Sequence, residues 1–200
     1  MKFPIGFAFN DESKKVEMEP LAQQAIVPVK SLVQVYFTDR NQTLTYFNDQ
    51  FDLKRVFRAG LANLKYRTSG SNKSLKYLFS TLNEHTEWLA AGAAGKPKPQ
   101  TASIINYENV TIEHISSQAD ASPLPEFSGE NVHRFYNLTI LTVGENDRAK
   151  NKPYALKKPI YEASEYVLNK QFSTIASWDY TEAKKWEDYL KDFACKVFVV

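Results

Sequence analysis

Two short segments separated by a polar connector constrain the fold of this chain more than any other feature. The first, residues 110–115, is a run of strand-forming residues that an acid–histidine pair interrupts. The second, residues 137–152, opens with Asn137, continues as an apolar run and then becomes polar and basic. Apolar and β-branched runs of this length predict strands, and a polar segment beginning after a glycine is typical of a short helix. The sequence therefore predicts a strand, a connector, a second strand at 137–143 and a short helix from about Glu145.

The composition is that of an ordinary globular protein. Two hundred residues allow one domain or two small ones, and 43% of the residues are apolar. The single cysteine, Cys195, cannot form an internal disulfide, and its isolation excludes cysteine-based zinc sites. No apolar run approaches the roughly 18 residues of a membrane span, and the first residues lack the long apolar stretch of a signal peptide. We therefore expect a cytoplasmic protein with no membrane-spanning segment.

Helical periodicity dominates outside the two predicted strands. Apolar residues at helical spacing predict helices at 28–48, 52–66, 73–91, 160–175 and 181–196. In the first of these segments the β-branched residues are equally compatible with strands. The Gly- and Pro-containing segment 95–99 ends the third helix and marks a predicted domain boundary. We expect an α+β fold, mostly helical, with a helical linker or arm region at 1–95 and a second domain at 104–200.

The net charge is +2, but the basic residues are unevenly distributed along the chain. Residues 53–83 contain no acidic side chain but include Lys54, Arg55, Arg58, Lys65, Arg67, Lys73 and Lys76. A second basic zone, residues 130–160, has six basic residues against three acidic ones. Two basic zones in a nearly neutral chain indicate a polyanionic partner, although a solvated helix face explains the first zone equally well. We expect Arg55 and Arg58 to contact nucleic-acid phosphates.

Each polar residue of the two segments also has a purely structural interpretation. A single strand histidine such as His114 is more often structural than catalytic, Asn137 is compatible with a turn, and Asn146 with a helix cap. His85 is expected to have a surface or packing role, and we expect that His133 does not support the site. The order and spacing of the residues together favour a functional site.

Three motifs of the chain resemble one known family. Residues 111–118, TIEHISSQ, resemble an IEHI-x-PQ motif, and residues 136–141, YNLTIL, resemble GNLTLL. Asn146 and the segment 151–164 resemble the tail N…N-x-x-F-x-x-K…Y…S, through Asn151, Lys157, Tyr161 and Ser164. All three motifs are similar to the C-terminal HNH-like (ββα-metal) nuclease domain of GmrSD-type restriction and phage-defence proteins. The nine-residue interval from Asn137 to Asn146 is also similar to that of the HNH domain in CRISPR RNA-guided nucleases.

This resemblance implies a ββα-metal (HNH) core with flanking helices, preceded by a helical linker domain. It also implies one divalent cation, Mg²⁺ or Mn²⁺, with Glu113 and Asn146 as its protein ligands, because such a cation prefers oxygen ligands and keeps several waters. His114 is the expected general base, and Asn137 orients its imidazole or holds the loop that carries it. Because neighbouring strand residues point to opposite faces, Glu113 and His114 share a site only if the strand end twists or bulges.

The implied function is metal-dependent cleavage of DNA phosphodiester bonds by an endonuclease, a hydrolase that serves a prokaryotic restriction or antiviral defence system. DNA contacts are expected from residues on or just after the short helix, namely Arg148, Lys150, Asn151 and Lys152. The family's usual N-terminal half is a ParB-like nucleotide-binding domain, so we expect a ParB-like domain or subunit as a partner. Two departures from the motifs, Ser117 for Pro and Tyr136 for Gly, favour the alternative of an inactive DNA-binding or assembly module.

Overall fold

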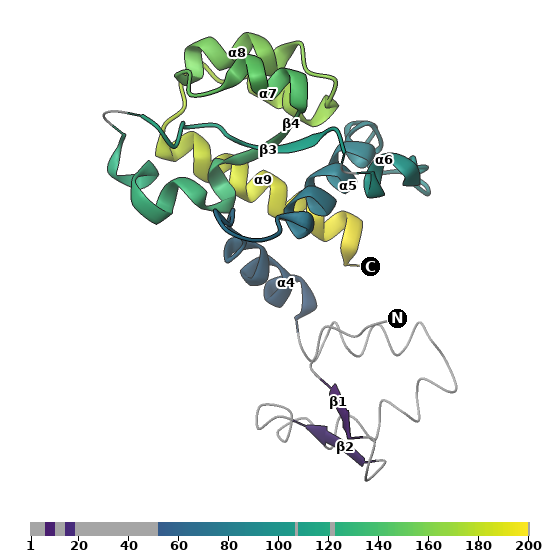
Figure 1. Cartoon of the computed structure of the whole chain (residues 1–200). Helices are drawn as coiled ribbons and strands as arrows, with labels where there is room; N and C mark the ends of the chain where they lie inside the picture. The colour runs from purple at the N-terminus through teal and green to yellow at the C-terminus, as the bar shows by residue number, and fades with distance from the viewer. Residues whose placement is uncertain (1–6, 11–14, 19–51, 107, 121–122, 200) are drawn as a thin grey trace. The chain divides into compact units, whose positions relative to one another are not determined.

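The structure, a computed structural model, describes residues 7–10, 15–18, 52–106, 108–120 and 123–199. It divides into two compact units, Met1–Leu53 and Lys54–Val200. In the first unit, β1 (Phe7–Asn10) pairs with β2 (Lys15–Met18) in antiparallel fashion (Figure 1). The helix predicted at 28–48 lies outside the described residues.

A two-stranded antiparallel sheet lies at the centre of the second unit. β3 (Val110–His114) pairs with β4 (Leu138–Thr142) so that Val110 faces Thr142 and His114 faces Leu138. β4 is buried along its whole length, because helices pack against the sheet. Both predicted strands are confirmed, although Asn137 belongs to the 3₁₀ turn η3 (Phe135–Asn137) that leads into β4.

Helices pack on the sheet from more than one direction. α7 (Val143–Ala149) follows β4 directly and contacts both strands, as does α5 (Lys73–Ala90). Figure 1 shows α7 and α8 (Tyr154–Glu162) on one side of the strands and α9 (Tyr180–Phe198) on the other. The indole Nε1 of Trp186 on α9 donates to the carbonyl of Leu138 at 3.0 Å, which ties this helix to the start of β4. The chain is therefore a mostly helical α+β protein, as expected.

The remaining elements are short and mostly connect these layers. They are α4 (Leu53–Ala62), α6 (Thr101–Ile105), η1 (Pro125–Phe127), η2 (Gly129–His133) and η4 (Val167–Thr174). The predicted helices at 52–66, 73–91 and 181–196 are confirmed as α4, α5 and α9, with small differences at their ends. No helix in the described part of the chain combines the length and the apolarity needed to cross a bilayer.

The single helix predicted at 160–175 is wrong, because α8 ends at Glu162 and η4 is a separate 3₁₀ helix. The break has a physical cause in the carboxylate of Glu145. This buried side chain accepts hydrogen bonds from the hydroxyl of Ser164 at 3.1 Å and from the backbone N–H of Glu165 at 2.8 Å. A backbone donor that binds a distant carboxylate is not available to continue the helix.

Glu145 also determines where α7 begins. Its carboxylate accepts from the backbone N–H of Thr142 at 3.0 Å, while the Thr142 hydroxyl accepts from the backbone N–H of Glu145 at 3.2 Å. This reciprocal capping box starts the helix at Val143, two residues before the predicted position.

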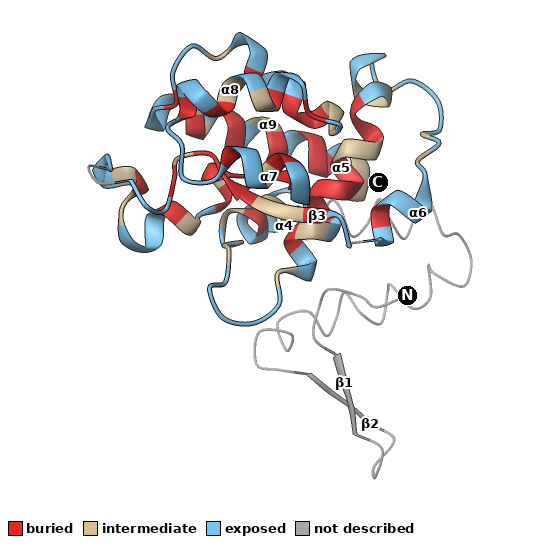
Figure 2. Ribbon diagram, turned by 45° about the horizontal axis from the view of Figure 1, so that its top comes forward, coloured by how far each residue is buried: buried red, intermediate tan, exposed pale blue. Residues whose placement is uncertain are grey.

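One hydrophobic core joins α5 to the elements that follow residue 104. Its fully buried members include Phe79, Leu82, Phe135, Ile140, Phe172 and Phe193. They come from α5, η3, β4, η4 and α9. Figure 2 shows buried and exposed positions on the same helices, with the exposed ones at the outside of this unit. The region that precedes the Pro-containing segment 95–99 therefore contributes to the same core as the two strands.

Candidate functional site

A polar cavity of about 200 Å³ lies around the C-terminal end of β3. Its walls are formed by Tyr66, Ile112, Glu113, His114, Ser117, Gln118, Asn146, Lys150, Asn151 and Lys157. These residues come from the segment after α4, from the end of β3 and its following turn, from α7 and the segment after it, and from α8. The structure thus brings together the predicted site residues Glu113, His114, Asn146, Lys150 and Asn151.

The end of β3 presents two neighbouring side chains to this one cavity. Glu113 and His114 are both buried, with 4% and 5% of their surface exposed. The pairing with β4 is regular as far as His114, so β3 contains no bulge. Alternation along a strand would point these two side chains to opposite faces of the sheet. His114, however, is the last paired residue of β3. The two residues therefore share the cavity because it encloses the strand end and the turn beyond it.

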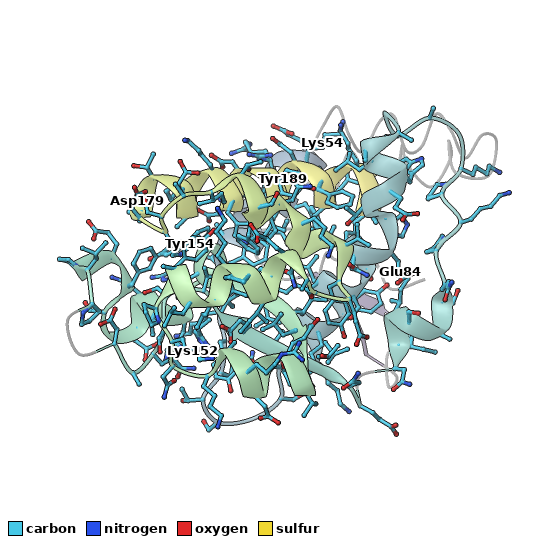
Figure 3. The ribbon with its side chains drawn as sticks, turned by 90° about the horizontal axis from the view of Figure 1, so that it is seen from above. Lys54, Glu84, Lys152, Tyr154, Asp179 and Tyr189 are labelled. Atoms are coloured by element: carbon cyan, nitrogen blue, oxygen red, sulfur yellow. The ribbon has the colours of Figure 1, made fainter. Side chains whose placement is uncertain are left out.

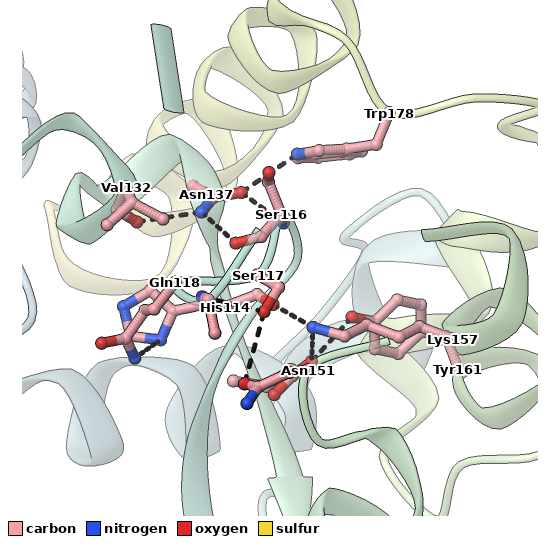
Figure 4. Close-up of polar contacts among 12 residues, drawn as sticks. His114, Ser116, Ser117, Gln118, Val132, Asn137, Asn151, Lys157, Tyr161 and Trp178 are labelled. Atoms are coloured by element: carbon pink, nitrogen blue, oxygen red, sulfur yellow. Dashed lines mark hydrogen bonds and ion pairs between the residues drawn. The ribbon is translucent and has the colours of Figure 1, made fainter. Parts of the chain in front are cut away.

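A buried lysine of α8 holds this strand end. The Lys157 ammonium, 1% exposed, lies 2.7 Å from Glu113 Oε1 and donates to the carbonyl oxygen of His114 at 2.6 Å (Figure 4). The Tyr161 hydroxyl donates to the same Glu113 oxygen at 3.1 Å. Burial raises the pKa of the Glu113 carboxyl, and the Lys157 ammonium opposes that rise. Lys157 and Tyr161 belonged to the motif tail, but sequence reasoning assigned neither of them a role.

The imidazole of His114 has a neighbour at each ring nitrogen. Its Nε2 lies 3.1 Å from Nδ1 of His133, and its Nδ1 lies 2.8 Å from the amide nitrogen of Gln118. Tyr66 stands edge-on to the His114 ring, with the centroids 4.8 Å apart. Burial, helped by the nearby His133 and Lys157, lowers the pKa of His114 to about 3. The ring is therefore uncharged at neutral pH, and His133, which we expected not to support the site, is in direct contact with it.

Asn137 is fully buried and uses its whole amide to join two loops. Its Nδ2 donates to the carbonyls of Ser116 at 3.0 Å and Val132 at 2.9 Å. Its Oδ1 accepts from the backbone N–H of Ser116 at 2.7 Å and from the indole Nε1 of Trp178 at 3.1 Å (Figure 4). Two donors and two acceptors exhaust the amide. Of the two roles that were expected for Asn137, this geometry corresponds to holding the loop that follows His114.

The two departures from the motifs are accommodated locally. Tyr136 is not among the described residues with positive φ, so its side chain causes no left-handed strain. Its hydroxyl donates to the carbonyl of Glu126 at 2.8 Å. Ser117 is buried, and its hydroxyl donates to the Asn151 side-chain oxygen at 3.3 Å. Ser117 thus links the turn after β3 to the segment after α7.

Asn146 lies on α7, and Lys150 directly follows the last residue of this helix; both belong to the cavity wall. The cap interpretation of Asn146 is wrong, because Thr142 and Glu145 cap this helix. Arg148 and Lys152 are exposed and do not belong to the cavity wall; Lys152 lies between α7 and α8 (Figure 3).

The two predicted phosphate-binding residues of α4 lie away from this cavity wall. Arg58 forms ion pairs with Asp188, at 3.7 Å, and with Asp192, both on α9. Its side chain is 34% exposed, so its guanidinium helps to hold α4 against α9. Arg55 is exposed on the same helix.

The donor set of the cavity fits a hard divalent cation better than a softer metal. In the described ranges, no group of three or more His, Cys, Asp and Glu residues gathers in a way that could hold a metal ion. Mg²⁺, however, needs only one or two protein oxygens and keeps several waters. The Lys157 ammonium and the Tyr161 hydroxyl both contact Oε1 of Glu113, and the backbone of His114 also interacts with this carboxyl, which supplies the oxygens that such a cation prefers. Asn146 adds an amide oxygen on the same cavity.

Comparison with known proteins places the chain in a family. An α+β fold with a carboxylate and an uncharged histidine in one polar cavity defines a candidate hydrolytic site. A sequence model described as GmrSD restriction endonucleases, C-terminal domain, matches residues 51–193, more than two thirds of the chain. The chain therefore belongs to this family, which implies a nuclease module of the restriction-endonuclease type with DNA as its substrate. Among curated proteins no match is found.

Acid should destabilise the folded state through His114. An unfolded histidine ionises near pH 6.5, whereas folded His114 ionises near 3. Between these values the unfolded chain binds more protons, so the free energy of unfolding falls as the pH falls. From pH 7 to pH 5 we expect wild type to lose about 2 kcal/mol more than His114→Gln, at roughly 1.36 kcal/mol per pH unit. Urea denaturation of both proteins in EDTA measures this difference, and equal losses would contradict the assigned direction.

Removal of the Asn137 amide should destabilise the fold without any change in charge. Asn137→Ala leaves the indole N–H of Trp178 and the backbone groups of Ser116 without their partner. Because buried unsatisfied groups cost about 1–3 kcal/mol each and do not add fully, we expect a loss of roughly 3 kcal/mol in chemical denaturation. Asn131→Ala is the matched control, since Asn131 is exposed, and it should change stability by less than about 0.5 kcal/mol. Similar losses for the two variants would refute the bridging role.

Proposed function

We propose that this domain is a metal-dependent endonuclease of the ββα-metal (HNH) type that hydrolyses DNA phosphodiester bonds in a prokaryotic restriction or antiviral defence system. The observation that carries the proposal is the single cavity shared by Glu113, His114 and Asn146. The order of β3, β4 and α7 supports it, because β3 supplies Glu113 and His114, and α7, which follows β4, supplies Asn146.

Glu113 and Asn146 are the proposed ligands of Mg²⁺ or Mn²⁺. When bound, the cation would polarise the scissile phosphate and stabilise the leaving oxygen. Lys157 fixes one oxygen of the Glu113 carboxyl and favours its ionised form against the effect of burial, and a cation ligand requires that form. The same ammonium repels a cation, so the affinity of the site for metal is set by the balance of these two effects.

His114 is the proposed general base. Its low pKa leaves the ring unprotonated at neutral pH, which is the form that can accept a proton from the attacking water. The anionic phosphate of a bound substrate favours the protonated ring and so raises its proton affinity during the reaction. Asn137 and Lys157 hold the loop and the strand end on either side of the ring and thus preserve its position.

DNA contacts are proposed along the C-terminal part of α7 and the segment after it. Lys150 and Asn151 belong to the cavity wall, and Arg148 and Lys152 are exposed beside it. Together they would bind phosphates on both sides of the scissile bond. Arg55, which is exposed on α4, is a further proposed phosphate contact. The ion pairs of Arg58 hold this residue to α9. We place the module in the cytoplasm, with a ParB-like nucleotide-binding domain or subunit as its partner.

The second candidate is an inactive DNA-binding or assembly module of the same fold. The buried ion pair between Lys157 and Glu113 is the observation that favours it, because the ammonium already neutralises the carboxylate that a cation needs. Ser117, in place of the motif's proline, points in the same direction.

Plasmid nicking separates the two candidates. We expect wild type to nick supercoiled DNA with Mg²⁺ or Mn²⁺ but not with EDTA. His114→Ala should lower the rate by about 10²–10⁴-fold, the usual contribution of general acid–base catalysis. Glu113→Gln and Asn146→Ala should raise the metal concentration needed for half-maximal rate and weaken Mn²⁺ binding measured by electron paramagnetic resonance.

Asn131→Ala is the control for Asn146→Ala and should leave both the rate and Mn²⁺ binding unchanged. Equal nicking by wild type and His114→Ala would exclude His114 as the base. DNA binding by wild type without nicking under any metal would favour the inactive module.

Salt dependence of DNA binding tests the proposed phosphate contacts separately from cleavage. Each phosphate contact contributes roughly 0.9 to the slope of log affinity against log salt on duplex DNA. Replacement of Lys150 and Lys152 together by Gln should therefore flatten the slope by about two units, measured by fluorescence anisotropy in EDTA. The charge-matched control replaces the exposed lysines Lys96 and Lys98 by Gln and should leave the slope unchanged. Equal slopes for the test and control proteins would remove the segment after α7 from the DNA interface.

A further inference from the structure

The hydrogen bonds of His114 determine which of its nitrogens carries the proton. The Gln118 amide nitrogen, 2.8 Å from His114 Nδ1, acts only as a donor, so Nδ1 is the acceptor and bears no hydrogen. An uncharged imidazole then carries its single proton on Nε2. That proton has one neighbour within hydrogen-bonding distance among the described residues, Nδ1 of His133 at 3.1 Å.

We propose that His133 is a positioning residue, whose Nδ1 accepts the Nε2 proton of His114 and so keeps the Nδ1 lone pair of His114 as the basic site. The role of this tautomer in catalysis rests on the proposed nuclease function. His133 does not belong to the wall of the cavity and acts only through His114.

His133 is held by the segment that follows α4. The backbone N–H of Tyr66 donates to the His133 carbonyl at 2.8 Å, and that of Phe135 donates to the Leu64 carbonyl at 3.1 Å. The Tyr66 ring stacks on His133 at an interplanar angle of 25° and stands edge-on to His114. The acceptor nitrogen is thus fixed by backbone pairing and by ring contact, as positioning of a tautomer requires.

The Gln118 amide donates a hydrogen bond to the Nδ1 lone pair of His114, and the attacking water needs that same lone pair. This residue is exposed and belongs to the turn beyond β3, so its amide can leave His114 without disturbing the core. In the reaction, water passes one proton to His114 Nδ1 as its oxygen forms a bond to phosphorus, and the bond to the leaving 3′-oxygen breaks. The Nε2–H bond of His114 stays intact and hydrogen-bonded to His133 throughout, and the leaving oxygen takes its proton from solvent.

Two substitutions of His133 distinguish the role of its acceptor nitrogen from that of its ring. His133→Asn keeps a side-chain oxygen near the position of Nδ1, whereas His133→Phe keeps a ring against Tyr66 but removes the acceptor. Nitrogen-15 NMR of the His114 ring in EDTA should show one tautomer, protonated on Nε2, in wild type and in His133→Asn. His133→Phe should show a mixture of tautomers. In cleavage assays, kcat of His133→Phe should fall by about 10–100-fold with KM unchanged, and His133→Asn should recover most of this loss.

Gln118→Ala is a second test of the His114 tautomer. Because Gln118 is exposed, this variant should fold even if His133→Phe does not. The proposal requires that His114 stay protonated on Nε2 when the Gln118 amide is removed. A change of tautomer in Gln118→Ala, a wild type protonated on Nδ1, or an unchanged kcat in a folded His133→Phe would each overturn it. The NMR measurement needs no cleavage, so a wild type that cuts no DNA would refute the proposed function and leave the tautomer assignment standing.

Discussion

The contact of the Lys157 ammonium with Glu113 and His114 is the interaction on which the rest of the site depends. An ammonium buried to this degree is tolerated only when its charge and its N–H groups are satisfied, and two consecutive residues of β3 supply the acceptors. α8 is thereby held at the end of the sheet, where it closes one wall of the cavity. The ion pair that stabilises the fold at this point also orients the proposed metal ligand Glu113. A substitution of Lys157 should therefore change both the stability and the activity of the protein.

Other buried polar side chains serve the irregular parts of the chain in the same way. Asn137 joins the turn after β3 to the loop before β4. Asn169 donates to the carbonyl of Ile140 at 2.7 Å and accepts from the hydroxyl of Thr139 at 2.6 Å, so a side chain takes the place of a third strand beside β4. A two-stranded sheet leaves backbone groups without partners, and buried amides satisfy them where another strand is lacking. The precision of a site built at loop ends follows from these bonds.

Local patterns were enough to predict the two strands, α4, α5 and α9, because each of these elements carries its own periodicity. They were not enough for residues 160–175, where the carboxylate of Glu145 interrupts the helix from a distance in the chain. The same distinction holds for the site. Glu113, His114 and Asn146 share the cavity as their motifs indicated, since the first two are consecutive on β3, and α7, which carries the third, follows β4 directly and packs on β3. The contacts of Tyr66 and His133 with His114 depend on pairing between distant segments, and a buried role for Lys157 is opposite to what its residue type suggests.

Tyr66 sets a lower limit on how far the protein can be shortened. A variant beginning at residue 73 or at residue 104 would retain both strands and every proposed metal ligand. It would nevertheless lack the ring that covers the two histidines and the backbone donor that holds the second of them. Such a truncated protein would expose its paired imidazoles to water and lose their mutual alignment, so a minimal version of this domain has to begin upstream of residue 64.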